Sequence, residues 1–386
     1  MRKIDINEKQ IGKIDVYLKG QGFDLSENKR INVKNCKHIS IERDGLFSLR
    51  DHAKPESLDF LYINDIHKTK FYPILIKEML IYCKIGGFIV LDLKKRGIID
   101  FCEFIKSIKK LVGAKTAIRK ENFKERVFVF QKTQGFLEKE DSITRWSFGI
   151  ISGGNKIDQI DKQIEIIKNL KIPSYEIIIC GKYKETKDNK INYIEFDDFG
   201  TGWITGKKNV IAENAKYENM VIMHDRIMPN KDFYEGMKKY GNYFEVLSCK
   251  VLNDKKERCG DWMTYGNPFN KVSRIGDLDY RDWDKYIWID GALFIMKKAV
   301  WRQVQFDENL FWNQGEDRKM AEDWKDKGII PRFNPFSSCF TTSWRHGKLP
   351  FYKINVKKLG KREISLLHQI KQDVKFYIKS ILGMKR

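Results

Sequence analysis

Short apolar runs alternate with stretches of helical periodicity along the first 132 residues of the chain. Apolar, β-branched and aromatic runs predict strands, a repeat of three to four residues predicts helices, and clustered glycines predict turns. On these criteria we expect strands at 14–18, 58–63, 88–93 and 126–130, helices at 73–83 and 101–112, and turns at 20–22 and 85–87. This alternation predicts a mostly parallel sheet with helices on both faces.

A second series of elements begins after residue 145. The pattern predicts a strand at 148–151, a glycine-rich turn at 152–155, an amphipathic helix at 157–170 and a strand at 175–180. Such a unit forms a right-handed crossover, and its first turn lies where an open α/β sheet binds a nucleotide. Ser152 and Gly153 are therefore candidates for ligand binding, although a Ser-Gly-Gly turn is also an ordinary tight turn.

A buried strand over 220–223 is predicted to deliver His224, Asp225 and Arg226 at its carboxyl end. It follows a glycine-rich loop and a helix that begins near Lys207. A carboxylate and an imidazole at such a strand end can hold a divalent cation. The alternative is that these three side chains form a solvated strand end.

Paired acids open a predicted helix further along the chain. Glu316 and Asp317 precede a helical pattern that runs through Trp324. The positive end of a helix favours an ionised acid, and a positioned carboxylate can remove a proton from a hydroxyl. The alternative is that the two acids serve only to cap the helix.

Composition divides the chain into three parts. The 386 residues carry a net charge of +21, of which +11 falls in residues 1–135, +2 in 136–350 and +8 in 351–386. All nine tryptophans follow residue 145. We therefore predict one domain over 1–135, a second over 136–350 and a basic tail over 351–386, with a short linker at 134–141.

Cysteine usage and hydropathy predict a cytoplasmic protein. The seven cysteines are scattered without a C-x-x-C pair, and the charged start Met1-Arg2-Lys3 lacks the apolar segment of a secretory signal. No apolar run reaches the 18 residues of a transmembrane helix.

The first part of the chain resembles the class I S-adenosylmethionine-dependent methyltransferases. "SLDFLYINDIH" and "LIKEMLIYCKIGGFIVLDL" resemble a strand and a helix-turn-strand of that family, within residues 10–132. The family's glycine-rich loop is reduced to Gly20-Gln21-Gly22, and Lys34 stands where the resemblance implies a ribose-binding acid. Because that acid accepts the ribose hydroxyls, we expect a degenerate scaffold that does not hold S-adenosylmethionine tightly. Methyl transfer is the alternative.

The second part resembles the inverting family 2 glycosyltransferases of GT-A fold. Lys208-Asn209 match the family's basic-Asn pair, and "NMVIMHDRI" matches its metal-motif strand. The resemblance implies that Ser152, Gly153, Lys208, Asn209, His224 and Asp225 bind a nucleotide-sugar donor. His224 and Arg226 stand where the family usually has carboxylates. The implied Mn²⁺ or Mg²⁺ would be held by Asp225 and by His346, which lies in a downstream loop.

Two further blocks extend this resemblance. "YIWIDGALFIMKK", which contains Asp290 and Gly291, resembles the family's acceptor-side strand, and "FWNQGEDRKM" resembles its "GEDxE" motif. The resemblance implies that Asp317 removes the acceptor proton while Glu316 contacts acceptor hydroxyls. Asp290, Gly291 and Trp312 are the implied acceptor-binding residues.

The tail from residue 357 has apolar positions at helical spacing and a lysine-rich face. This pattern predicts a basic amphipathic helix, which could bind an anionic membrane surface on the inner face of the membrane. It could equally dock on the protein itself with its lysines in solvent.

We therefore predict two Rossmann-like α/β domains and a C-terminal helix, in an inverting glycosyltransferase that acts on a glycan or lipid-linked acceptor. The first alternative is a bifunctional methyltransferase and glycosyltransferase that makes a surface glycan. The second is a nucleic-acid-binding protein, suggested by charge alone. Because the sequence has no zinc-finger spacing or RNA-binding aromatic signature, we expect no nucleic acid partner.

Overall fold

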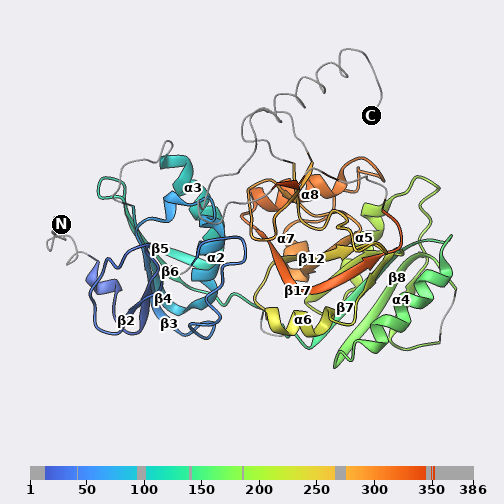
Figure 1. Cartoon of the computed structure of the whole chain (residues 1–386), viewed down its shortest axis with the longest axis horizontal. Coiled ribbons are helices and arrows are strands. Elements are labelled where there is room, and N and C mark those ends of the chain that lie inside the picture. Colours follow the sequence, from blue (N-terminus) through green and yellow to red (C-terminus); the bar gives the residue numbers. More distant parts are fainter. Residues whose placement is uncertain are drawn as a thin grey trace, which may run out of the picture.

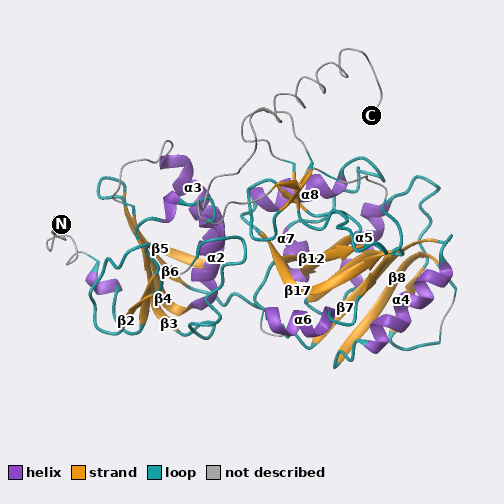
Figure 2. Ribbon diagram, viewed as in Figure 1, coloured by secondary structure: helices purple, strands orange, loops and turns teal. Residues whose placement is uncertain are grey.

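The computed structural model describes residues 14–40, 42–93, 101–138, 141–184, 187–265, 275–344, 349 and 351–352. Two large mixed sheets stand side by side, each with helices packed against it (Figures 1 and 2). The structure also has a small third sheet of four strands. The predicted α/β class with two Rossmann-like sheets is confirmed. The predicted tail helix lies outside the described residues.

The first sheet has six strands in the order β2-β1-β3-β4-β6-β5. Strands β1 to β4 are parallel, whereas β6 is antiparallel to both β4 and β5. The strands are β1 (Gly22–Asp24), β2 (Cys36–His38), β3 (Leu58–Ile63), β4 (Cys83–Asp92), β5 (Thr116–Asn122) and β6 (Val127–Lys132). The helices are α2 (Tyr72–Tyr82) and α3 (Phe101–Val112), with short 3₁₀ turns η1 (Asp15–Tyr17), η2 (Ile66–Lys68) and η3 (Gly113–Lys115).

Both described helices cover the same face of this sheet. Side chains of α2 and α3 share one apolar cluster with alternate residues of β3, β4 and β6. The opposite face packs against Ile14, Leu18 and Ile31, which come from a 3₁₀ turn and a loop. The prediction of helices on both faces is therefore wrong for the described residues, because short irregular segments bury the second face.

Two local predictions in the first sheet are also wrong. Residues 15–17 form a 3₁₀ turn, and the first strand begins only at Gly22. Gly20 therefore precedes β1 and Gly22 is the first residue of β1, while cofactors of open α/β sheets bind beyond the carboxyl ends of the strands. The expected turn at 85–87 lies inside β4, where Gly86 adopts a φ of +85°.

The second sheet has eight strands in the order β11-β17-β12-β16-β10-β7-β8-β9. Its strands are β7 (Arg145–Gly153), β8 (Ser174–Lys182), β9 (Ile191–Ile194), β10 (Asn219–His224), β11 (Ile227–Pro229), β12 (Val246–Leu252), β16 (Leu293–Lys297) and β17 (Pro331–Thr341). Its helices are α4 (Ile157–Asn169), α5 (Ile204–Asn214), α6 (Phe233–Tyr240), α7 (Lys298–Gln303) and α8 (Glu316–Asp326).

The predicted crossover unit of the second sheet is confirmed. β7 and β8 run parallel and α4 connects them, while β10 pairs parallel to the other edge of β7. After β7 the chain therefore forms β8 on one side of β7, and it later returns to form β10 on the other side of β7. This reversal of strand order creates a switch point at the carboxyl end of β7, which is where ligands of open α/β sheets bind.

The third sheet has its four strands in the order β15-β13-β14-β18. Its short strands are β13 (Met263–Thr264), β14 (Gly276–Leu278), β15 (Ile287–Trp288) and β18 (Phe351–Tyr352). The predicted acceptor-side strand is therefore divided, since β15 ends at Trp288 and β16 starts at Leu293. The loop between them carries Asp290 and Gly291.

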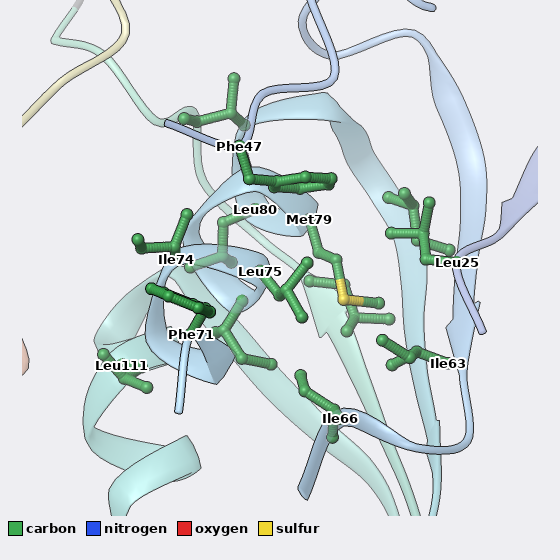
Figure 3. Close-up of a cluster of buried hydrophobic side chains, with 14 of the residues drawn as sticks. Leu25, Phe47, Ile63, Ile66, Phe71, Ile74, Leu75, Met79, Leu80 and Leu111 are labelled. Carbon is green, nitrogen blue, oxygen red and sulfur yellow. The ribbon is translucent and has the colours of Figure 1, made fainter. Parts of the chain in front are cut away.

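Helix α2 is buried along almost its whole length. Every residue from Pro73 to Tyr82 is buried. One side of the helix packs on the first sheet, where Met79 and Leu75 meet Ile63 and its neighbours (Figure 3). The same apolar cluster includes Trp262, Trp283 and Phe333 from the second part of the chain. The helix is therefore buried all round because both parts of the protein cover it.

Buried ion pairs cross the same interface. Arg332 of β17 donates to Oε1 of Glu78 on α2 at 2.9 Å and to the carbonyl of Phe47 at 2.6 Å. Oε2 of Glu78 accepts the amide of Leu49 at 2.8 Å. Nearby, Lys77 donates to Glu245 at 2.8 Å. Because both partners of the Arg332–Glu78 pair are buried, loss of one leaves a charge without compensation.

Within the described residues, the helices are all too short or too polar to cross a bilayer.

We predict that Glu78→Gln lowers the free energy of unfolding by about 3–5 kcal/mol, because it leaves Arg332 buried without its counter-charge. Guanidinium denaturation measures the effect. A matched control is Lys68→Gln, which removes an exposed pair with Glu27 and should leave the midpoint unchanged. Equal midpoints for Glu78→Gln and wild type would show that the interface does not depend on this pair.

Candidate active site

The ends of β7 and β8 are tied together where the switch point lies. The hydroxyl of Ser152 donates to the carbonyl of Lys182, and it accepts the amide of Gly154 at 3.1 Å. Gly181 has a φ of +122°, and a Cβ there would stand 2.1 Å from the carbonyl oxygen of Ser152. Two backbones thus meet at van der Waals contact, while Gly153 remains exposed. The predicted residues Ser152 and Gly153 do lie at the edge of this switch point.

Lys207 is a residue of this edge that the sequence analysis did not single out as a site residue. Its Nζ donates to the carbonyl of Ser152 at 3.0 Å and to Oδ2 of Asp198 at 2.7 Å, and its side chain is buried. Adjacent lysines on α5 point in different directions, and the family pattern directed attention to the neighbouring Lys208. Which of the two lysines faces the strand ends depends on how α5 is rotated relative to β7. The sequence alone does not define that rotation.

Lys208 points instead toward the start of α8. Its fully buried Nζ lies 3.4 Å from Oε1 of Glu316, and it sits 4.8 Å from the ring centre of Phe294 and 5.3 Å from that of Phe306. A buried ammonium gains from both a carboxylate and aromatic faces. Lys208 therefore lies beside the predicted acids.

Asn209 holds a loop in place. Its amide nitrogen donates to the carbonyl of Phe306 at 2.9 Å and to Glu308 at 2.8 Å, while its oxygen accepts from Trp301 at 3.0 Å and from the amide of Phe306. These four bonds use the full hydrogen-bonding capacity of the side chain. The structure thus places Asn209 as a support of the 306–308 segment. None of these four bonds supports the prediction that Asn209 binds the donor.

Asp225 follows β10 as predicted and is surrounded by positive charge. Its Oδ1 lies 3.8 Å from Nζ of Lys156, the residue that precedes α4. Burial raises the pKa of Asp225, while Lys156, Arg226 and Lys207 oppose that rise. His224 is anchored through its backbone, because its amide donates to the carbonyl of Ala292 at 3.0 Å and its carbonyl accepts from Gln163. Lys156 is a second residue that the sequence analysis missed.

The predicted metal ligands can be tested only in part. His346 lies outside the described residues. Among the residues that the structure describes, no three His, Cys, Asp or Glu side chains are grouped as a metal site would require. The charged side chains nearest Asp225 are cations, which would repel a divalent ion. The described residues therefore do not by themselves fit a metal, and Asp225 with His346 stays a prediction.

The loop between β15 and β16 joins the separate blocks of the site. Asp290 accepts the amide of Ala292 at 2.8 Å and lies 3.5 Å from the guanidinium of Arg226. The amide of Gly291 donates to Oδ2 of Asp317 at 3.0 Å. A Cβ on Gly291 would stand 2.7 Å from Oε1 of Glu316, so a larger residue would displace the carboxylate of Glu316. The residues predicted from three distant motifs thus meet here.

Hydrogen bonds hold the carboxyl group of Asp317 in position, and this group is less acidic than that of an ordinary aspartate. It lies in the first turn of α8, and its Oδ1 accepts the amide of Arg318 at 2.8 Å while Oδ2 accepts that of Gly291. Burial and the neighbouring carboxylates of Glu316 and Asp290 raise its pKa to about 7. Lys208 and the amide bond of Gly291 oppose that rise. A carboxylate held by two amides and poised near neutrality suits proton transfer.

Trp312 lies at the surface, with 52% of its area exposed. Its amide donates to the carbonyl of Gly202 at 3.0 Å, and a Cβ on Gly202 would meet the Cβ of Trp312 at 2.9 Å. The residue therefore closes the glycine-rich loop against the segment that leads into α8. Its predicted contact with an acceptor stays a prediction.

Comparison with known proteins finds weak similarity to several solved structures. No protein-family model and no curated protein matches the sequence. The solved structure of GalNAc-T7 with UDP, GalNAc and Mn²⁺ matches with a TM-score of 0.38 at 11% identity, over 53% of this chain and 44% of that one. S. aureus TarS 1–349 in complex with UDP-GlcNAc matches with a TM-score of 0.37 at 14% identity, over 53% and 60%.

A third match is an inositol-1-phosphate CTP transferase from T. maritima, with a TM-score of 0.34 at 12% identity, over 53% of this chain and 91% of that one. This chain thus spans less than two thirds of GalNAc-T7 and of TarS 1–349. At these scores the likenesses assign no activity, which has to be argued from the side chains of the site.

We predict that Glu316→Gln lowers the pKa of Asp317 from about 7 toward its ordinary value of 3.8, because one of the two carboxylates that raise it is removed. Carbon-13 NMR titration of the labelled aspartate carboxyl groups, with the Asp317 signal assigned by loss in Asp317→Asn, measures this. Asp323→Asn, on the same helix, removes an acid paired with Lys319 and should leave the titration of Asp317 in place. An unchanged pKa in Glu316→Gln would disprove the electrostatic coupling.

Proposed function

We propose that this protein is an inverting glycosyltransferase that moves a sugar from a nucleoside-diphosphate donor to a hydroxyl of a glycan or lipid-linked acceptor. The observation that carries the proposal is the position of Asp317. A carboxylate with a raised pKa is held by two backbone amides, beside the loop that reaches the switch point of the second sheet. The predicted blocks that contribute to this arrangement are far apart in the sequence and close in space.

The donor would lie across the carboxyl ends of β7, β8 and β10. Switch points bind nucleotides in open α/β sheets. The first turn of α4 faces this edge, and Lys156, Lys207 and Arg226 supply positive charge around Asp225. Phosphate oxygens would find helix amides and cations there. These features support the assignment of Ser152, Gly153 and Asp225 to donor binding.

Transfer would proceed by direct displacement at the anomeric carbon. The acceptor oxygen forms a bond to that carbon as the bond to the diphosphate oxygen breaks, and the nucleoside diphosphate leaves with the electron pair. Asp317 takes the proton of the acceptor hydroxyl in the same step. Because its pKa is raised, the carboxylate is a stronger base than an ordinary aspartate, and it is still ionised in part at neutral pH.

Glu316 and Lys208 would hold the carboxylate of Asp317 in place and set its pKa. The ammonium of Lys208 balances one of the clustered carboxylates. Glu316 adds negative charge that strengthens Asp317 as a base. We keep Glu316, Asp290, Gly291 and Trp312 as residues that contact the acceptor. A divalent cation at Asp225 and His346 stays a prediction, and nothing in the steps above depends on it.

We propose that the first sheet is a scaffold. The loop after β1 is the place of a cofactor loop in such sheets, but here it closes on Asp24. That buried carboxylate accepts the amides of Ser26, Arg30 and Ile31, so these amides are not available to a phosphate or carboxylate ligand. The boundaries at 1–135, 136–350 and 351–386, the cytoplasmic location and the membrane contact of the tail stay proposals.

A panel of nucleotide sugars, with and without Mn²⁺, tests the function. We expect at least one nucleotide sugar to raise the melting temperature and to be hydrolysed slowly to the nucleoside diphosphate. Matched nucleoside monophosphates are the control, since they lack the diphosphate that the cations would hold. A protein that responds to no donor in either condition would overturn the proposal.

With a responding donor, we predict that Asp317→Asn lowers turnover about 10²–10⁴-fold, because it removes the general base, and leaves the donor-induced shift in melting temperature intact. Wild-type turnover should rise with pH through about 7, since the ionised form of Asp317 is the active one. Asp323→Asn is the matched control on α8. A fully active Asp317→Asn protein would refute the assignment of the base.

A further inference from the structure

Three cations stand around Asp225 at the switch point, and they differ in how far a ligand can reach them. Lys207 has only 4% of its side chain exposed, and its Nζ is already bonded to a backbone carbonyl and a carboxylate. Arg226 is 11% exposed and faces a second carboxylate. Lys156 is 38% exposed, and its Nζ lies 3.8 Å from Oδ1 of Asp225, beyond hydrogen-bond length. Of the three, Lys156 therefore has the ammonium that a ligand can contact.

The pairing of the strands explains why Lys156 and Asp225 meet. β7 and β10 run parallel with Ile151 opposite His224, so the two strands end side by side. Asp225 directly follows β10, and Lys156 follows β7 after a short turn, as the residue that precedes α4. Within the described part of the chain, no side chain caps this end of the helix. The topology thus places an ammonium beside the acid of β10 and at the positive end of a helix.

The same arrangement makes Asp225 a poor ligand for a divalent cation. Mn²⁺ and Mg²⁺ are held by several oxygen or nitrogen ligands, among which carboxylates supply the negative charge. Burial raises the pKa of Asp225, and the charges of Lys156, Arg226 and Lys207 oppose that rise. These cations already balance the carboxylate, and a divalent ion would have to enter against their repulsion. The described residues therefore do not fit the metal that the family resemblance implies.

An ammonium can do for a diphosphate what a metal ion does. When the bond between the anomeric carbon and the diphosphate oxygen breaks, the electron pair stays on that oxygen, and the added charge spreads over the phosphates. A lysine ammonium carries a full positive charge and three N–H donors, and its hydrogen bonds to phosphate oxygens are stronger than those between neutral groups. Lysine clamps on phosphate groups stabilise charge in this way.

We propose that Lys156 takes the place of the divalent cation and neutralises the diphosphate of the donor, so that donor binding and transfer need no metal. The inference rests on the proposed function and specifies how its leaving group is stabilised. Asp225 is then a positioning residue. In the free protein it holds the ammonium beside the switch point, and in the complex the ammonium turns to the phosphate oxygens.

The two models assign opposite roles to Lys156 and Asp225. If a metal on Asp225 held the diphosphate, Asp225→Asn would abolish binding and Lys156→Gln would change it little. If Lys156 holds the diphosphate, Lys156→Gln weakens binding, while Asp225→Asn removes a negative charge from the neighbourhood of the phosphates. A pair of single substitutions therefore separates the models.

Isothermal titration calorimetry of the full chain with UDP, GDP, CDP and dTDP, each in EDTA and in Mn²⁺, provides the test. We expect at least one of them to bind wild type in EDTA, with an affinity that Mn²⁺ changes by less than about threefold. In EDTA, Lys156→Gln should bind about tenfold or more weakly through loss of a charge-assisted bond. Lys156→Arg should keep most of the affinity, and Asp225→Asn should bind at least as tightly as wild type.

Lys168→Gln is the matched control, because it removes an exposed lysine that pairs with Asp188 near the other end of α4. It should bind normally. Binding that requires Mn²⁺ and is lost in Asp225→Asn would overturn the inference and restore the metal. Wild-type affinity of Lys156→Gln in EDTA would overturn it as well, since another group would then hold the diphosphate.

The comparison of wild type in EDTA and in Mn²⁺ tests the inference even if a variant fails to fold, which circular dichroism would detect. A wild-type protein that binds none of the nucleoside diphosphates in either condition would instead count against the proposed function. The two failures are therefore distinguishable.

Discussion

The hydrogen bond from the amide of Gly291 to the carboxylate of Asp317 is the contact on which the candidate site depends. It brings the loop between β15 and β16 onto the first turn of α8. A side chain at position 291 would displace the carboxylate of Glu316, so the glycine lets the loop approach α8 without disturbing this acid. Arg226 reaches the same loop through Asp290, so one tight contact connects the end of β10 with the proposed base.

The rigidity that such a contact requires comes from the rest of the second sheet and from its union with the first. Helix α2 is covered on one side by its own sheet and on the other by Trp262, Trp283 and Phe333. The strand that carries Arg332 also ends at Thr341, which pairs with Ile227 directly after Arg226. The buried pair of Arg332 with Glu78 therefore links the first sheet to the strand that borders Arg226 in the candidate site.

Periodicity and strand-end reasoning were sufficient for the regular elements and for the residues at strand ends. They placed β3, α3 and the β7-α4-β8 unit, whereas the resemblance to the glycosyltransferases is what linked Asp225 with Asp317 in the prediction. They failed where tertiary contacts decide: residues 14–18 have strand propensity but form a 3₁₀ turn. Lys156 and Lys207 were missed because charge spacing cannot show which lysine on a helix faces the strand ends. The raised pKa of Asp317 depends on Asp290, a neighbour 27 residues away along the chain.

The central claim is that a nucleoside diphosphate binds at the switch point of the second sheet, beside Asp225 and within reach of the base. A crystal structure of the full chain with a nucleoside diphosphate tests this most directly. The account predicts that the diphosphate lies at the carboxyl ends of β7 and β10, in contact with Lys156, Lys207 or Arg226. Electron density for the nucleotide at the first sheet, or elsewhere with this edge empty, would contradict it.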